Sequence, residues 1–379
     1  MYSPTSVTSI GTSKRLVIRV ARIALPNGIG GPHEVTCQNG AITSIASIKD
    51  GYEDMLLTPG FVDIQVNGIG RIDVSNASDD DWQQLDRALL EQGVTTWLPT
   101  LISAPLDSYA RKFSSVVAAQ QRPNTSRPDI AGVHLEGPFL GDALGAHDPR
   151  FANATDTDWF NQIPDIVRIV TLAPENPGAM AAISAFRNRN IVVAVGHSRA
   201  PDDKTLEAID LGVQLVTHLF NGMSGIHHRD DGVALIALTD DRVAFSLIAD
   251  LVHIKPRAIA LAFRAKPHAV VLVTDSIAFE SESAVKRGIR ISNGGPRLSD
   301  GRLAGSSLTM NTAIRNVVEE CGVDPHLAIQ AATSMPTRLL GLVDRGSIAV
   351  GQRADLVALD RQFAVQHTWI GGQLVFSRH

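Results

Sequence analysis

Residues 191–218 read IVVAVGHSRAPDDKTLEAIDLGVQLVTH, and this stretch contains one complete strand–helix–strand unit. The apolar run IVVAV predicts a buried strand, and VQLVT predicts a second one. Between them, DDKTLEAIDL begins with aspartates and carries apolar residues at helical spacing, which is typical of an amphipathic helix. A histidine follows each run, His197 after the first and His218 directly after the second. The unit therefore predicts parallel strands with polar side chains at their carboxyl ends.

Six further apolar runs follow the same pattern and alternate with helical stretches. They cover residues 61–66, 95–101, 130–135, 167–172, 243–249 and 269–273. Eight strand–helix units are the number that closes a (β/α)8 barrel, and a doubly wound sheet is the main alternative. We therefore predict an α/β fold in which a TIM barrel takes up most of the chain.

Both ends of the chain differ from this pattern, because they alternate polar and apolar residues. The segments 15–24 and 41–47 predict strands near the start, and 354–359 and 368–376 predict strands near the end. Strand-rich segments at both termini predict one small β domain built from the two ends together.

The composition excludes several classes of protein. The 379 residues carry a formal charge of −5, and a general nucleic-acid or membrane-surface binder would need a basic face. Cys37 and Cys321 are too few for a disulfide framework, and no apolar run approaches the roughly 18 residues that span a bilayer. We expect a soluble cytoplasmic protein.

Side chains able to bind a metal stand at the carboxyl ends of several predicted strands. Glu136, His197 and His218 occupy such positions, and in a barrel these ends meet on one face. Two imidazoles and a carboxylate with an open position form the ligand set of a catalytic zinc. A lone strand-end histidine is more often a satisfied core residue, but three such groups together favour a metal site. His134 points to the same face as Glu136, and we expect it beneath the site as a supporting residue.

Asp275 ends the predicted eighth strand in the sequence VLVTDS. A carboxylate there could accept a proton from an activated water and pass it to a leaving group, although a helix N-cap is the alternative. His253 and His147 are candidate hydrogen-bond donors to a substrate, and an ordinary loop position suits each of them equally well.

The segment 217–232, THLFNGMSGIHHRDDG, combines a strand-end histidine with an Asn-Gly turn and one arginine. Backbone N–H groups of the turn, together with Arg229, could hold a phosphate by charge-assisted hydrogen bonds. The alternative is a solvated loop in which Arg229 pairs with Asp230 or Asp231.

Five motifs together resemble a known family. They are HLEGPF (134–139), GHSRA (196–200), THLFNGM (217–223), VTDS (273–276) and LAGSSLTMN (303–311). The chain resembles the N-acetylglucosamine-6-phosphate deacetylases of the amidohydrolase superfamily, in register from PGFVDIQVNG at 59–68 to GSIAVGQRADLVALD at 346–360. The resemblance implies a (β/α)8 barrel at residues 58–346, with a small β-sandwich formed by residues 1–57 and 347–379.

The resemblance also implies a role for each matching residue. Glu136, His197 and His218 would bind one divalent metal, zinc first, with iron, cobalt and manganese as alternatives. Asp275 would be the catalytic acid and base, assisted by His147. The substrate would contact the following residues: Ala146, His147, Asn221, Gly222, Arg229, His253, Leu303, Ala304 and Gly305. In relatives the arginine comes from the neighbouring subunit, which implies a homodimer.

Two departures from the family pattern lie near this site. Many amidohydrolases end the first strand with a pair of histidines, where this chain has Gln65 and Asn67. Neutral amides bind transition metals poorly, so we predict a single metal. The second departure is the segment Asp250-Leu251-Val252-His253, where a bulkier residue replaces the glycine of a DGLH motif.

The implied reaction removes the acetyl group from N-acetylglucosamine 6-phosphate, giving glucosamine 6-phosphate and acetate in amino-sugar catabolism. Asp275 would act first as general base and then as general acid. The alternatives are a deacetylase of N-acetylgalactosamine 6-phosphate, another amidohydrolase, and a catalytically inactive barrel that serves as a scaffold. The four residues Glu136, His197, His218 and Asp275 argue against a scaffold, which would need none of them.

Overall fold

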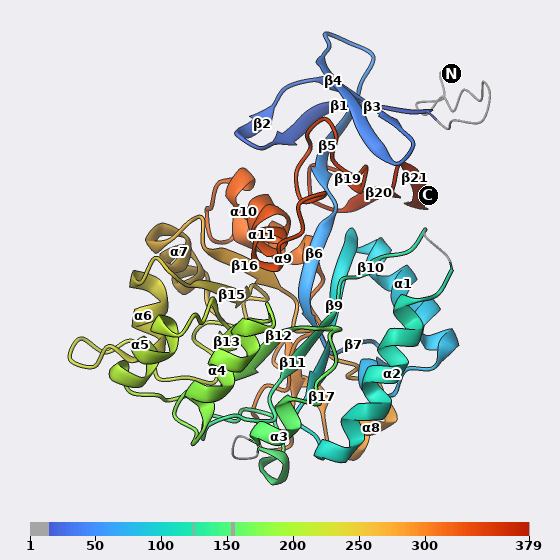
Figure 1. Ribbon diagram of the computed structural model, residues 1–379. Coiled ribbons are helices and arrows are strands. Elements are labelled where there is room, and N and C mark those ends of the chain that lie inside the picture. The colour runs from blue at the N-terminus through green and yellow to red at the C-terminus, as the bar shows by residue number, and fades with distance from the viewer. Residues whose placement is uncertain (1–14, 124–125, 153–155, 379) are drawn as a thin grey trace.

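A closed barrel of parallel strands forms the centre of the computed structural model, which describes residues 15–123, 126–152 and 156–378 (Figure 1). The barrel strands are β6 (Phe61–Val66), β9 (Val94–Ile102), β11 (Val133–Glu136), β12 (Val167–Leu172), β13 (Val192–Val195), β14 (Leu215–Val216), β15 (Ala244–Ile248) and β16 (Val270–Val273). Each strand pairs in parallel with the next, and the short β10 (Asp129–Ile130) adds to β9. All eight apolar runs of the sequence supply these strands, so the predicted barrel is confirmed.

The barrel closes between its first and last strands. The Asp275 N–H donates to Gln65 O at 2.9 Å, and Val66 and Ser276 form a parallel bridge. Beneath them the buried Asp63 carboxylate accepts a hydrogen bond from Thr274 Oγ1 at 2.6 Å, and burial raises the pKa of Asp63 to about 7. These bonds fix Gln65 and Asp275 next to each other.

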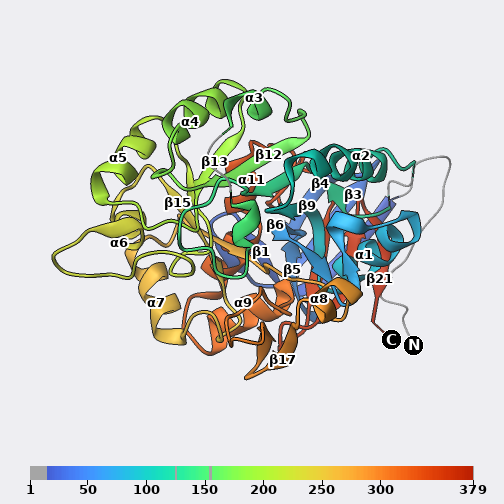
Figure 2. The ribbon, with the colours of Figure 1, turned by 90° about the horizontal axis from the view of Figure 1, so that it is seen from below.

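Helices surround the barrel and bury one face each against it (Figure 2). They are α1 (Asp79–Glu91), α2 (Tyr109–Gln120), α3 (Thr157–Phe160), α4 (Ala179–Asn188), α5 (Asp202–Asp210), α6 (Gly232–Thr239), α7 (Pro256–Ala265), α9 (Met310–Glu319), α10 (Pro325–Ala332) and α11 (Ser334–Leu340). Short 3₁₀ helices occupy Val74–Asn76, Leu106–Ser108 and Pro149–Phe151. α1 shows why the sequence folds this way, since Ser78 and Asp81 form a capping box and Trp82, Leu85 and Leu89 are buried. Among the described helices, none is long and apolar enough to cross a membrane.

A second, mixed sheet combines both ends of the chain (Figure 1). Its strands are β1 (Arg15–Leu25), β2 (Gly28–Gly30), β3 (His33–Gln38), β4 (Ala41–Ser47), β5 (Glu53–Pro59), β19 (Leu356–Leu359), β20 (Val365–Ile370) and β21 (Gln373–Ser377). β5 joins the two ends, because it pairs in parallel with β1 and antiparallel with β19. Apolar side chains of both ends, including Leu57 and Trp369, form a core separate from that of the barrel. The predicted fold class is therefore confirmed.

The small sheet differs from the sequence prediction in detail. The predicted strand 368–376 is two strands, because Gly371 and Gly372 adopt positive φ values of 53° and 73° and turn the chain between β20 and β21. β3 and β5 were not predicted. The division of the chain at residues 57/58 and 346/347 stays a prediction, and residues 1–14 of the first segment lie outside the described residues.

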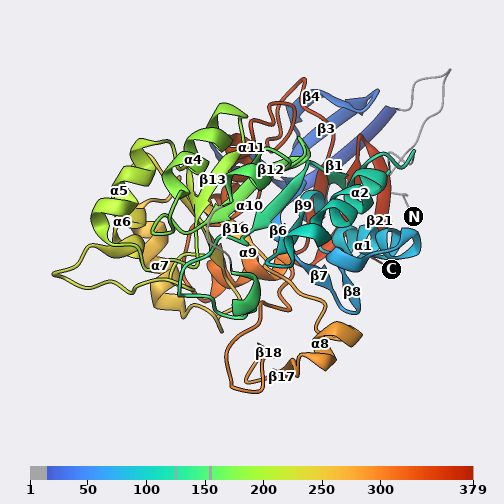
Figure 3. The same ribbon diagram turned by 60° about the horizontal axis from the view of Figure 1, so that its bottom comes forward.

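One further segment lies beyond the carboxyl ends of the barrel strands. Residues 277–305, which we call the strap, contain α8 (Glu282–Lys286), β17 (Arg290–Ser292) and β18 (Gly295–Arg297). The strap projects from the barrel together with the small hairpin β7 (Gly68–Ile69) and β8 (Ile72–Asp73) (Figure 3). Its position over the strand ends makes it one wall of the site described next.

Candidate metal and active site

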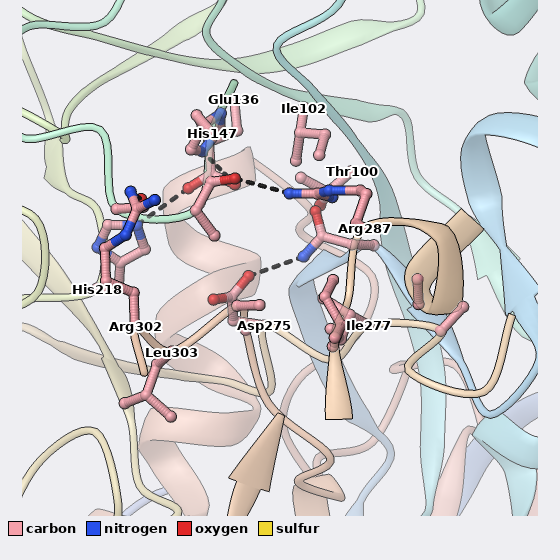
Figure 4. A pocket seen from close by; sticks show the side chains of 18 of the residues that line it. Thr100, Ile102, Glu136, His147, His218, Asp275, Ile277, Arg287, Arg302 and Leu303 are labelled. Carbon is pink, nitrogen blue, oxygen red and sulfur yellow. Dashed lines mark hydrogen bonds and ion pairs between the residues drawn. The ribbon is translucent and has the colours of Figure 1, made fainter. Parts of the chain in front are cut away.

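Four side chains predicted from strand ends meet in one cavity. Glu136 is the last residue of β11, and His197, His218 and Asp275 each lie two residues beyond the end of β13, β14 and β16. All four are buried, and they line a cavity of about 310 Å³ (Figure 4). The sequence-predicted cluster is therefore brought together by the fold.

The Glu136 carboxylate is the centre of this cluster. Its Oε1 atom lies 3.2 Å from His197 Nε2 and 3.0 Å from His218 Nε2, and the two nitrogens are 3.1 Å apart. His197 Nδ1 donates to Ala143 O at 3.0 Å, because a carbonyl oxygen can only accept. In that tautomer His197 Nε2 presents a lone pair to the carboxylate oxygen, and a cation between them would satisfy both. Two imidazole nitrogens and one carboxylate oxygen therefore fit a divalent transition metal.

His147 is a fourth metal-capable group at the same place. Ligand atoms of Glu136, His147 and His197 lie within 4.8 Å of one another, but His147 Nε2 is 4.0 Å from Glu136 Oε2, whereas the other two histidines contact Oε1 at shorter distances. Its Nδ1 atom is 3.0 Å from Ser103 Oγ. We favour His218 over His147 as the third ligand, because His218 is closer to the shared oxygen. Burial lowers the pKa of His147 to about 3, so the ring is neutral at neutral pH.

The neutral amides of Gln65 and Asn67 donate hydrogen bonds to the two acidic groups of the site. Gln65 Nε2 donates to Glu136 Oε1 at 2.9 Å and to Asp275 Oδ1 at 3.3 Å. Asn67 Nδ2 donates to the same Asp275 oxygen at 2.8 Å. The two amides therefore orient the carboxylates by donating hydrogen bonds to them.

The electrostatics of the two carboxylates differ. Burial, reinforced by the nearby charge of Glu136, raises the pKa of Asp275 to about 8. Burial would also raise the pKa of Glu136, but the adjoining imidazoles of His197 and His218 hold it well below its usual value. Two acids with separated pKa values suit two roles, one as a permanent anion and one as a proton carrier.

Three of the four side chains stand on strained backbone. His197, His218 and Asp275 have φ values of 51°, 34° and 47°, in a region that residues with a Cβ atom rarely adopt. Such conformations cost about 1–3 kcal/mol each and persist where the surrounding structure enforces them. Here each follows the end of a barrel strand, where it turns a functional side chain toward the cavity.

The predicted substrate contacts fall into two groups. Ala146, Asn221, Gly222, His253, Leu303, Ala304 and Gly305 all line the cavity. His253 Nδ1 lies 2.7 Å from Asp250 Oδ2, which leaves Nε2 free to contact a ligand. Arg229, by contrast, is exposed on the loop before α6 and is not among the described cavity-lining residues. It contacts His228 Nε2 at 2.7 Å.

His134 supports the site from below. Its ring is buried, with Nδ1 2.9 Å from Ile64 O and Nε2 2.8 Å from Thr171 Oγ1. Both nitrogens are therefore engaged by protein atoms, as the supporting role predicts.

Several residues of the site were not assigned a role from the sequence. Ser103 contacts His147, the Gln65 and Asn67 amides hold the carboxylates, and Arg287 and Arg302 of the strap line the cavity. For Gln65 and Asn67 a signal was present, because residues i and i+2 at a strand end point to the same face. The strap arginines stand in no such pattern.

Known proteins share this chain's architecture and sequence. A model of the amidohydrolase family matches residues 56–375. An N-acetylgalactosamine-6-phosphate deacetylase of Escherichia coli O157:H7 is 34% identical over 373 residues, covering 94% of this chain and 98% of its own length. An N-acetylglucosamine-6-phosphate deacetylase of Bos taurus is 35% identical over 353 residues, covering 85% of this chain and 83% of its own.

Solved structures agree with these matches. An N-acetylglucosamine-6-phosphate deacetylase of Thermotoga maritima superimposes with a TM-score of 0.88 at 30% identity, covering 96% of this chain and 100% of its own. A mutant of the Mycobacterium smegmatis deacetylase, solved with N-acetyl-D-glucosamine-6-phosphate, gives a TM-score of 0.87 at 29% identity, with coverage of 96% and 100%. From the barrel, the strand-end cluster and these matches together, we conclude that the chain belongs to the amidohydrolase family.

Proposed function

We propose that this protein is a metal-dependent deacetylase that hydrolyses the acetamide of N-acetylglucosamine 6-phosphate to glucosamine 6-phosphate and acetate. The observation that carries the proposal is the convergence of Glu136, His197 and His218 opposite Asp275 in one buried cavity. Similarity to hexosamine-6-phosphate deacetylases over most of the chain supports the same substrate class.

Glu136, His197 and His218 would hold one divalent metal. Bound there, a metal supplies a water nucleophile at neutral pH and polarises the amide carbonyl. A second metal beside it finds no histidine pair, because Gln65 and Asn67 turn amide N–H groups toward the carboxylates. Zinc suits the donor set, and iron, cobalt or manganese are alternatives.

Asp275 would move the proton. Its Oδ1 atom already accepts hydrogen bonds from Asn67 and Gln65, so Oδ2 is left to take a proton from the attacking water. The same oxygen then returns the proton to the departing amine, which is too basic to leave as an anion. Both donors also fix the orientation of the carboxylate during the transfer.

His147 and the cavity wall would orient the substrate. The Nδ1 atom of the neutral His147 ring contacts the Ser103 hydroxyl, so Nε2 is available to donate to the acetamide oxygen. Ala146, His253 and the segment 303–305 would contact the sugar. Asn221 and Gly222 would contact the phosphate, completed by Arg229 of a neighbouring subunit in a homodimer.

The decisive experiment measures acetate release by the zinc-loaded protein. The substrates are N-acetylglucosamine 6-phosphate, its galactosamine epimer and the unphosphorylated sugar. We expect turnover of the first and a loss of at least about 10³-fold in kcat for Asp275→Asn, which keeps its zinc. An active Asp275→Asn variant would remove Asp275 from its role, and no turnover of any sugar phosphate would reject the proposal.

A second candidate is the deacetylation of N-acetylgalactosamine 6-phosphate. The E. coli relative with that name is 34% identical and covers 94% of this chain. The same substrate panel decides between the epimers, since the preferred one has the higher kcat/KM.

A further inference from the structure

The loop of residues 143–147 touches two functional histidines at once. Ala143 O accepts the hydrogen bond from His197 Nδ1 at 3.0 Å, so this carbonyl sets the orientation of the His197 ring. Four residues later the same loop carries His147, whose Nδ1 lies 3.0 Å from Ser103 Oγ. A displacement of the loop would therefore disturb both rings.

Two arginines of the strap hold this loop by its backbone. Arg287 Nη2 donates to Ala146 O at 2.7 Å, and Arg302 Nη1 donates to Gly145 O. The two guanidinium groups approach from opposite sides of the cavity (Figure 4). Two consecutive carbonyls of the loop, Gly145 O and Ala146 O, are thus each bound by an arginine of the strap.

Apolar packing joins the strap and the loop independently of these bonds. Ala284, Ile289 and Ala304 of the strap form a small core of their own, against which Ala146 of the loop packs. This cluster is separate from the core of the barrel. The strap and the loop are therefore joined by apolar contacts as well as by the two arginine bonds.

The charges of the two arginines have different surroundings. The Arg302 guanidinium is paired with Asp300 at 2.7 Å, which holds its side chain in position. Arg287 has no carboxylate partner among the described residues, so its bond to Ala146 O is its principal polar contact. Both arginines are exposed to solvent, and a charged donor makes each bond roughly twice as strong as a neutral hydrogen bond.

We propose that Arg287 and Arg302 are positioning residues, which clamp the 143–147 loop so that His197 and His147 keep their working orientations. Neither arginine then needs to touch the reacting atoms. The expected effect on turnover rests on the proposed function, whereas the effects on loop mobility and zinc affinity do not.

The test uses Arg287→Met, Arg302→Met and the double variant, with Arg290→Met as the matched control. Arg290 is an exposed arginine of the same strap and is not among the described residues that line the cavity. Hydrogen–deuterium exchange reports the amides of residues 143–147, such as the His147 N–H that is bonded to Leu144 O. A chelator competition reports zinc affinity, and kinetics separate kcat from KM.

We expect each clamp variant to exchange these amides faster and to lose about 10-fold in zinc affinity and kcat, with little change in KM. Arg287→Lys keeps one charged donor and should recover part of the loss. The control should behave like the unaltered protein. Thermal unfolding identifies a variant that fails to fold. The proposal is then judged on the single variants whose unfolding transitions are intact.

Unchanged exchange and zinc affinity in both single variants would overturn the clamp. A rise in KM confined to phosphorylated substrates, without faster exchange, would also overturn it, because it would make the arginines direct phosphate ligands. If the unaltered protein releases no acetate from any substrate, the proposed function fails, while exchange and zinc affinity still test the clamp.

Discussion

The amides of Gln65 and Asn67 donate hydrogen bonds to different sets of carboxylates. Gln65 bonds to both Glu136 and Asp275, whereas Asn67 bonds to Asp275 alone. This difference makes the pair a matched set for separating the metal site from the proton carrier.

We predict that Gln65→Ala lowers zinc affinity about 10-fold, because Glu136 loses the donor that orients it. Asn67→Ala should leave zinc affinity close to that of the unaltered protein while lowering kcat. Competition with a chelator of known affinity measures the first effect, and steady-state kinetics measure the second. Equal losses of zinc affinity in both variants would contradict this division.

Asp275 should also link metal binding to pH. In the metal-free protein its pKa is raised to about 8, so the carboxyl group is protonated at pH 7. A nearby cation favours the ionised form, and zinc uptake at pH 7 should therefore expel this proton. Zinc affinity should accordingly rise with pH up to about 8 and then lose this dependence.

Calorimetry in two buffers of different ionisation enthalpy counts the protons released. At pH 7 the unaltered protein should release about one more proton than Asp275→Asn, and the difference should vanish well above pH 8. The same count for both proteins at pH 7 would show that Asp275 is already ionised without metal.

The sequence predicted the chemistry-bearing residues that directly follow apolar runs, and it could not predict their partners. Glu136, His197, His218 and Asp275 stand out because each interrupts a buried run with a polar group. The bond from Gln65 to Asp275 joins residues 210 positions apart, and only the closure of the barrel brings them together. For the same reason no local sequence pattern predicts the hydrogen bond from Arg287 to Ala146 O, which joins residues 141 positions apart.

At the scale of helices and strands, the connection between α6 and β15 depends on one buried cation. Lys266, which is 8% exposed, donates to Ala237 O at 3.1 Å and to Asp240 O and Val243 O at 2.5 Å. These carbonyls end α6 and begin the path to β15. The ammonium group therefore links the end of α6 to the start of the path to β15.

We predict that Lys266→Met lowers the free energy of unfolding by about 3 kcal/mol, since three carbonyls lose a charged donor. Lys255→Met is the control, because Lys255 is exposed and its ammonium group donates to a single carbonyl among the described residues, Leu251 O at 3.1 Å; its effect should stay within about 0.5 kcal/mol. Urea unfolding measures both. Equal effects of the two substitutions would show that the buried lysine does not stabilise the turn.

The sequence predicts a strand well where burial is continuous along it. It predicts a strand less well where pairing with neighbouring strands determines the backbone conformation. The barrel strands β6 and β12 match their apolar runs residue for residue, because both faces of each strand are covered. β5 begins with Glu53 and Asp54 and becomes apolar only later, so its pattern is weak; it is a strand because β1 and β19 flank it. The 368–376 segment was predicted as one strand, but Gly371 and Gly372 turn the chain within it and divide it into β20 and β21.

At the scale of the whole molecule, the position of Arg229 allows the proposed dimer to be tested. It is exposed and does not reach the cavity of its own subunit in the described structure. If it completes the neighbouring site, then Arg229→Ala and Asp275→Asn damage different sites of a mixed dimer.

Each variant alone should be nearly inactive at low substrate concentration. Mixed and re-equilibrated, they should recover about a quarter of the unaltered activity, because half of the dimers then contain one site with both residues intact. Acetate release measures the recovery, and native mass spectrometry verifies that mixed dimers formed. Mixed dimers without recovered activity would show that Arg229 does not serve the neighbouring site.

The mixed sheet has a consequence for how the protein is made. β5 pairs with β19, which a ribosome synthesises only after the entire barrel. Until then one edge of β5 and apolar side chains such as Leu57 remain open to other chains. A truncated product that ends before β19 would keep this edge exposed permanently. The sheet thus forms only after β19 has been synthesised, and chaperones or proteases that recognise open strand edges can distinguish copies in which β5 is still unpaired.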